Sequence, residues 1–133
     1  MKLNVEVGDM AAPDINKAKQ FLEQLHHVTI AVVDEQGKPW AVPVGVQHYN
    51  HGAIEWFSKT AAVHSRAIAA NEEVMLTAFT TNHDEFGEYG FFARARAKKI
   101  LSLPGIGRYR AEIYEAWYTD HKHKKLEINI KDL

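Results

Sequence analysis

Apolar residues at helical spacing open the regular part of the sequence. Asp14 precedes them, and they are Ile15, Ala18, Phe21, Leu22 and Leu25. This spacing places apolar side chains on one face of a helix, and aspartate is a preferred N-cap residue. The pattern therefore predicts an amphipathic helix that begins after Asp14, whereas residues 1–13 give no clear signal.

A pair of strands is predicted next. Residues 27–33, HVTIAVV, are rich in β-branched side chains and run into a turn at 34–37, DEQG. Residues 40–47 form the second strand, and Pro39 and Pro43 place it at a sheet edge or kink it, because proline has no N–H for a central ladder. The sequence therefore predicts a hairpin.

After a turn at residues 48–52, a short strand runs into a helix. The strand positions predicted to share one face are Ile54, Trp56 and Ser58. The helix positions predicted to share one face are Val63, Ala67 and Ala70, with His64, Ser65 and Arg66 near the first turn. A helix N-terminus beside hydroxyl and basic groups suits a phosphate monoester, although a solvated loop with unrelated charges explains the same pattern.

The second half of the chain alternates more strongly. Residues 74–80 predict a strand and 81–90 a polar loop, while at 91–100 alternation with a basic face predicts another strand, although the alanines there would tolerate a helix. After Pro104-Gly105, the helical spacing of Tyr109, Ile113, Ala116 and Trp117 predicts a helix over 108–117. The alternating apolar residues Leu126, Ile128 and Ile130 predict a final strand.

These elements predict a β-rich (α+β) fold, a small antiparallel split β-barrel with flanking helices, because short hairpin-joined strands outnumber the helices. A chain of 133 residues with 46% hydrophobic content is expected to form one domain over residues 1–133. Sixteen Lys and Arg against 17 Asp and Glu give no overall attraction to nucleic acid or an acidic membrane. With no cysteine and no apolar run of membrane-spanning length, we expect a cytoplasmic protein.

From residue 27 to about 100 the sequence resembles the FMN-binding split-barrel family typified by pyridoxamine 5′-phosphate oxidase. The resemblance rests on the order and spacing of five segments, HVTIAVV, GKPWAVPVGV, WFSK, HSRAIAAN and VMLTAF. It implies a homodimer with FMN at the subunit interface. The residues that it implies for the cofactor are Pro43 and Val44 through their backbones, Trp56 and Phe57, and Ser58, Lys59, His64 and Arg66 near the phosphate. Trp40, Trp56 and Phe57 are the aromatic residues expected to offer surface to the partner, although core positions would explain them equally well.

Two departures from that family shape the expected function. The family's C-terminal segment with Arg and His, which reads the substrate, is not present before Leu133, so vitamin B6 is not the expected substrate. His64 stands where many relatives carry a lysine, and histidine is only partly charged at neutral pH. The expected function is therefore a flavin-dependent oxidoreductase with an unidentified substrate, or a flavin- or haem-binding protein without turnover.

Other signals point to different chemistry. Residues 103–113, LPGIGRYRAEI, resemble a helix-hairpin-helix DNA-binding segment in which Arg108 and Arg110 would assist, but the preceding strand pattern and the near-neutral charge weigh against it. His48 with His51, and His121 with His123, have no clear third ligand, so no metal site is expected. No nucleophile constellation or dinucleotide fingerprint is present, and the sequence does not select a haem-binding histidine.

Overall fold

Antiparallel strands make up most of the structure, a computed structural model that describes residues 14–80, 86, 87, 89–119 and 125–133. The elements in this part of the chain are α2 (Ile15–Glu23), β1 (His27–Val33), β2 (Pro39–Gly45), β3 (His48–Asn50), β4 (Ala53–Lys59), α3 (Val63–Ala70), β5 (Glu73–Phe79), β6 (Gly90–Leu103), β7 (Ile106–Thr119), β8 (Lys125–Ile128) and the 3-10 helix η1 (Ile130–Asp132). The predicted β-rich fold is confirmed.

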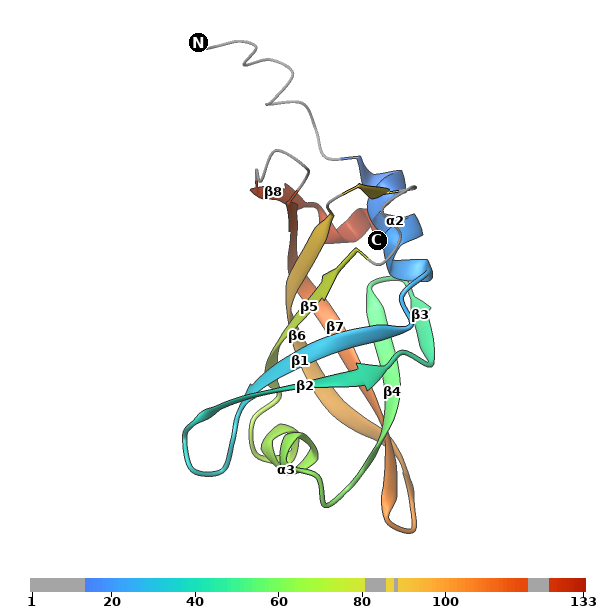
Figure 1. Cartoon of the computed structure of the whole chain (residues 1–133). Helices are drawn as coiled ribbons and strands as arrows, with labels where there is room; N and C mark the ends of the chain where they lie inside the picture. Colours follow the sequence, from blue (N-terminus) through green and yellow to red (C-terminus); the bar gives the residue numbers. More distant parts are fainter. Residues whose placement is uncertain (1–13, 81–85, 88, 120–124) are drawn as a thin grey trace.

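The strands form one curved sheet in the order β2-β1-β5-β6-β7-β4-β3, and β8 pairs with the end of β7 that β4 does not reach. Every pair in it is antiparallel. The strands β2 and β4 lie far apart in this order, yet they come into contact where the sheet curls round (Figure 1). The result is a split barrel, with a seam between β2 and β4.

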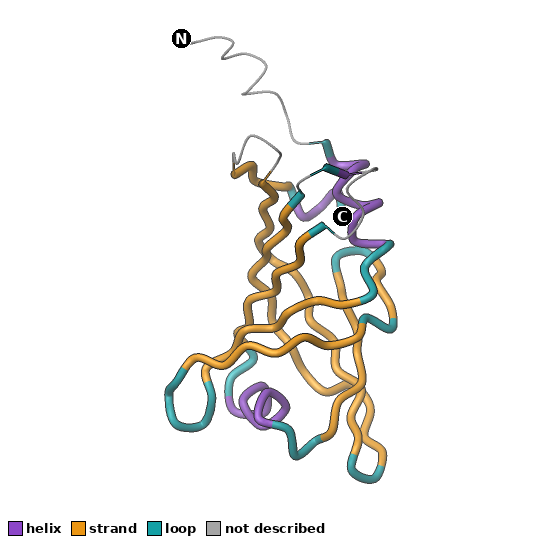
Figure 2. The backbone as a smooth tube through the Cα atoms, in the orientation of Figure 1, coloured by secondary structure: helices purple, strands orange, loops and turns teal. Residues whose placement is uncertain are grey.

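The described α-helices α2 and α3 lie at opposite ends of this barrel (Figures 1 and 2). At one end, the Asp14 carboxylate accepts a hydrogen bond from the Lys17 N–H at 3.1 Å and caps α2, as predicted. At the other end, α3 packs against β1, β2 and β6. Its buried residues are His64, Ser65, Ala67 and Ile68. Of the predicted apolar face, Ala67 is buried as predicted and Val63 is half-buried, whereas Ala70 is exposed, so the prediction is wrong for Ala70.

Small residues on β6 let the sheet pack closely around its interior. Phe91, Ala93, Ala95 and Ala97 are all fully buried, which confirms the predicted alternation in this segment. The strand extends beyond the predicted end at residue 100 to Leu103, where Pro104 and Gly105 form a two-residue turn into β7. Gly105 has a φ of +77°, which the third position of a type II turn requires.

The predicted helix at residues 108–117 is wrong, because this segment is part of β7. Its inward residues alternate up to Ile113 and then resume at Ala116. The register shift opposite Arg94 and Ala95 explains the break, since Tyr114 is an extra residue in β7. One inserted residue turns a spacing of two into a spacing of three, and this produced the apparent helical pattern.

The same hairpin removes the structural basis for the helix-hairpin-helix prediction. Residues 103–113 form a strand, a tight turn and a second strand rather than a helical hairpin. A smaller difference occurs at residues 48–50, where the predicted turn contains the short strand β3. The last predicted strand ends at Ile128 before η1, and most of the predicted loop at 81–90 lies outside the described residues. Among the described helices, none is long and apolar enough to cross a membrane.

Candidate cofactor site

Two side-chain hydrogen bonds fix the connection between β4 and α3. The Ser58 hydroxyl and the His64 Nε2 atom share a hydrogen bond of 2.8 Å. The Ser65 hydroxyl donates to the Lys59 carbonyl oxygen at 2.7 Å. These bonds join the last residues of the strand to the first turn of the helix, so the predicted residues Ser58, Lys59 and His64 do come together in space.

His64 is a buried, neutral member of this group. Its side chain is only 7% exposed, and burial lowers the pKa of its imidazole below the ordinary value. The alternative of an exposed helix face is therefore wrong for His64. At neutral pH the imidazole supplies a hydrogen-bonding partner for Ser58 and adds no positive charge to the site.

The N-terminus of α3 has no side-chain cap. Ala62 occupies the N-cap position with an extended backbone, and its methyl group has no acceptor for the N–H groups of the first turn. Such N–H groups lack carbonyl partners within their own helix and carry the positive end of the helix dipole. This end of α3 can therefore receive an anionic oxygen.

Arg66 is the cation nearest to this end on the helix itself. It is half-exposed, and its Nε donates to the Glu35 Oε1 atom at 2.7 Å. Its Nη1 also donates to the carbonyl oxygen of Ala61. Arg66 is thus held at the start of α3 by two contacts, one of which joins it to the β1–β2 turn. Lys59, at the end of β4, is exposed.

The residues predicted on β2 line the other side of the seam. Val44 is 7% exposed and forms part of the core, whereas Pro43 is exposed. The strand β2 contacts both β4 and α3, the two elements that carry Ser58 and His64.

The two predicted aromatic residues of β4 face opposite ways. Trp56 is completely buried and stacks on Tyr109 with ring centroids 5.9 Å apart. It offers no surface to a partner, so the expectation that it would do so is wrong. Phe57 is 41% exposed, with the Arg108 guanidinium 5.5 Å from its ring centroid, and Trp40 is 45% exposed. The Trp56 Nε1 atom is buried without a hydrogen-bond partner among the described residues.

Beside Phe57, on the outer face of the sheet, one buried carboxylate binds two arginines, and no sequence pattern predicted this contact. Glu55 is 5% exposed, and its two oxygens accept from the Nε atoms of Arg108 and Arg110, each at 2.8 Å. Burial acts to raise the pKa of Glu55, but hydrogen bonds and charge from Arg110 and Arg108 lower it overall. The two arginines of the former DNA-binding prediction are therefore occupied within the fold.

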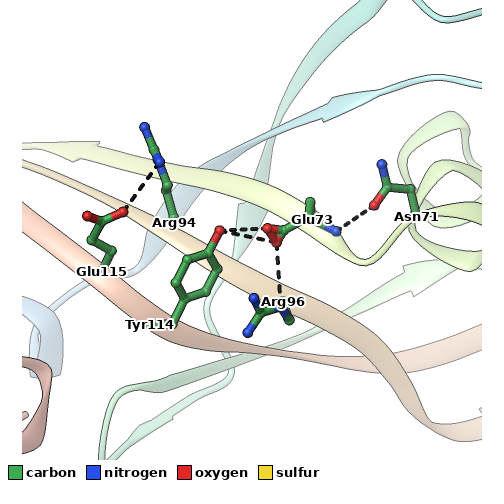
Figure 3. Close-up of polar contacts among 6 residues, drawn as sticks. All are labelled: Asn71, Glu73, Arg94, Arg96, Tyr114 and Glu115. Carbon is green, nitrogen blue, oxygen red and sulfur yellow. Dashed lines mark hydrogen bonds and ion pairs between the residues drawn. The ribbon is translucent and has the colours of Figure 1, made fainter.

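The basic face of β6 is neutralised in a similar way on the outer face of β5, β6 and β7 (Figure 3). Arg94 pairs with Glu115 at 3.4 Å, and Arg96 pairs with Glu73 at 3.6 Å. The Tyr114 hydroxyl donates to Glu73 at 2.6 Å, which raises the pKa of this exposed phenol. Arg94 and Arg96 of the predicted basic face thus meet anions of their own chain.

The histidines that the structure describes give no further candidate centre. His48 and His51 line an open polar recess of about 370 Å³ that Glu55, Arg110 and Glu112 also line. Within the described residues, no three His, Cys, Asp or Glu side chains are grouped so as to hold a metal ion. His121 and His123 lie outside the described residues.

Solved structures share this architecture. A heme binding protein from Mycobacterium smegmatis matches with a TM-score of 0.76 and 11% identity, over 92% of this chain and 61% of that one. A protein of the pyridoxinephosphate oxidase family from Clostridium acetobutylicum matches with a TM-score of 0.73 and 11% identity, over 89% of this chain and 95% of that one. An FAD-binding protein from Mesorhizobium loti matches with a TM-score of 0.66 and 12% identity, over 80% of this chain and 92% of that one.

These matches establish the fold. The chain has the split-barrel fold of pyridoxine phosphate oxidase-family proteins, which confirms the resemblance at the level of structure. No protein-family model matches the sequence, and no curated protein matches it. Similar folds at such low identity leave the ligand to be argued from the residues of this chain.

Proposed function

We propose that this protein binds a flavin at the seam between β2 and β4, and that this flavin is FMN. The observation that carries the proposal is the uncapped N-terminus of α3 beside the Ser58 and His64 pair, in a fold shared with a pyridoxinephosphate oxidase-family protein and an FAD-binding protein. An uncapped helix start favours an anionic oxygen, and the phosphate of FMN provides one.

The residues present fit such a ligand. Main-chain N–H groups of α3, the Ser58 hydroxyl and the exposed Lys59 would hold the phosphate, and Arg66 would join them if it turned from Glu35. The backbone at Pro43 and Val44 would lie along the ring system. Because Trp56 is buried, only its backbone would face the ligand, whereas the Phe57 side chain is exposed on the outer face. A bound flavin would supply the redox chemistry, and this chain would supply binding and orientation.

A homodimer belongs to this proposal. The outer surface near β4 and the β6–β7 turn exposes several large apolar side chains, which are Phe57, Ile100, Leu101, Leu103 and Ile106. Exposed apolar residues gathered in this way are characteristic of protein interfaces. A second subunit placed there would cover Phe57 and close the outer side of the seam, where a single chain leaves a bound ring system open to water.

The absorption spectrum of the purified protein, followed by titration of the apoprotein with FMN and with haem, tests the proposal. We expect the two visible bands of a bound flavin and a saturable change with FMN. An intense Soret band, or saturation by haem with no response to FMN, would replace the flavin by haem. Oxidation of a nicotinamide donor by the FMN-loaded protein would then separate an oxidoreductase from a binding protein without turnover.

A further inference from the structure

The ion pair between Arg66 and Glu35 links two segments that a flavin phosphate would have to approach together. Arg66 lies at the end of the first turn of α3, and Glu35 lies in the turn between β1 and β2. Their Nε and Oε1 atoms are 2.7 Å apart, and the two side chains are 47% and 55% exposed. This contact connects residues that are 31 positions apart in the sequence.

Two of the three nitrogens of the guanidinium already have a partner in this arrangement. Its Nε binds Glu35 and its Nη1 binds the carbonyl oxygen of Ala61. A guanidinium has five N–H groups in a planar fork, and it recognises a phosphate best when two neighbouring nitrogens point at it. A phosphate therefore meets a guanidinium whose Nε atom is already bound to a carboxylate and whose Nη1 atom is bound to a carbonyl oxygen.

The turn that carries Glu35 holds its backbone in place. The Asp34 carboxylate accepts hydrogen bonds from the N–H groups of Gln36 and Lys38, each at 2.9 Å. The Asp34 N–H donates to the Lys38 carbonyl oxygen at 2.8 Å. Glu35 is therefore presented from a rigid turn, and it shares a recess of about 230 Å³ with Arg66, Val63 and Trp40.

We infer that Glu35 is a specificity-determining residue that competes with the phosphate of a flavin for Arg66. The inference rests on the proposed flavin function and names the residue that weakens the preference for a phosphorylated flavin over riboflavin. An exposed ion pair contributes up to about 1 kcal/mol, which corresponds to a factor of about five in affinity at most. The competition is thus modest. It lowers the affinity for the phosphorylated flavin without preventing its binding.

The test compares FMN with riboflavin, which has the same ring system but no phosphate. The apoproteins to be titrated are the wild type, Glu35→Gln, Glu72→Gln, Arg66→Ala and the Glu35→Gln/Arg66→Ala double variant. Glu72→Gln is the control because it removes the same charge from an exposed glutamate beyond the other end of α3. We expect Glu35→Gln to tighten FMN binding about two- to fivefold and to leave riboflavin unchanged, with no effect of Glu72→Gln on either ligand.

The double variant shows whether Glu35 affects FMN binding through Arg66. If Glu35 acts by occupying Arg66, its replacement has no further effect on FMN once Arg66 is absent. An undiminished effect in the Arg66→Ala background would overturn the competition and leave direct repulsion between Glu35 and the phosphate. Unchanged FMN binding by Glu35→Gln, or an equal gain for riboflavin, would also overturn it. If neither FMN nor riboflavin bound to any of the five proteins, the wild type included, the proposed function itself would be rejected.

Discussion

Replacement of Glu55 by glutamine tests how much one buried carboxylate contributes to the stability of the β4–β7 pairing. Glu55 is 5% exposed and accepts hydrogen bonds from two guanidinium groups at 2.8 Å. The substitution keeps the shape of the side chain but removes its charge, so Arg108 and Arg110 face a neutral amide. Breaking a buried pair by removing one partner costs about 3 to 5 kcal/mol. Because the two arginine side chains are 33% and 39% exposed, water compensates them in part, and we expect about 2 to 3 kcal/mol here.

Urea denaturation followed by tryptophan fluorescence measures this loss, since Trp56 lies next to Glu55 in β4. The midpoint of unfolding should fall by roughly 1 to 2 M urea for a domain of this size. The control is Glu73→Gln, because Glu73 also pairs with an arginine, Arg96, but its side chain is 48% exposed. The midpoint shift of the control should be less than half that of Glu55→Gln.

The pH dependence gives a second, independent reading. The pKa of Glu55 is lower in the folded protein than its ordinary value of 4.5. The contribution of the ionised carboxylate to the free energy of unfolding is therefore complete above that pH. It is lost as the pH falls through the pKa that Glu55 has in the folded protein. The difference in stability between the wild type and Glu55→Gln should stay constant from pH 7 to about 5 and then narrow. Equal midpoint shifts for Glu55→Gln and Glu73→Gln, or a difference that does not narrow in acid, would refute the reasoning.

Three other outcomes are expected. Arg66→Ala should weaken FMN binding about tenfold and leave riboflavin binding unchanged in parallel titrations, because it removes one charged hydrogen bond to the phosphate. The pKa of His64 is lowered by burial, so its contribution to stability should be lost as the pH falls below about 6.5, and urea midpoints of the wild type and His64→Gln should converge there. Light scattering at micromolar concentration should give twice the mass of one chain for the wild type. The Phe57→Lys variant should give a mass closer to that of one chain, because it places a charge on the proposed interface. A wild type with the mass of one chain would contradict the dimer.

Sequence patterns predicted most of the sheet because its interior is filled by simple alternation. The run from Phe91 to Ala97 was assigned correctly since every second residue of it is buried. The assignment failed at β7, where the extra residue Tyr114 changes the phase of the alternation. A bulge depends on how two strands meet, and a single strand's pattern does not reveal it.

The candidate site was predicted where its contacts are local. Ser58 and His64 are six residues apart and meet across one strand-to-helix connection. The strand alternation of Trp56 and Phe57 already implied that their side chains point to opposite faces, so both could not contact one ligand. The partner of Arg66 was not predictable, because Glu35 reaches it only after the barrel has curled and brought the β1–β2 turn against α3.

The position of β7 in the sheet affects how the chain acquires its site during synthesis. Every residue predicted to hold the cofactor lies between Pro43 and Arg66, yet β4 pairs with residues 106–112 of β7 over its whole length. A nascent chain in which those residues have not yet been synthesised carries all of the residues predicted to bind the cofactor, but it lacks the strand that supports them. Domains generally fold as units as they emerge from the ribosome, and pairing between distant strands is slow. The proposed site is therefore completed late, and we expect any cofactor loading to follow synthesis of the C-terminal strands.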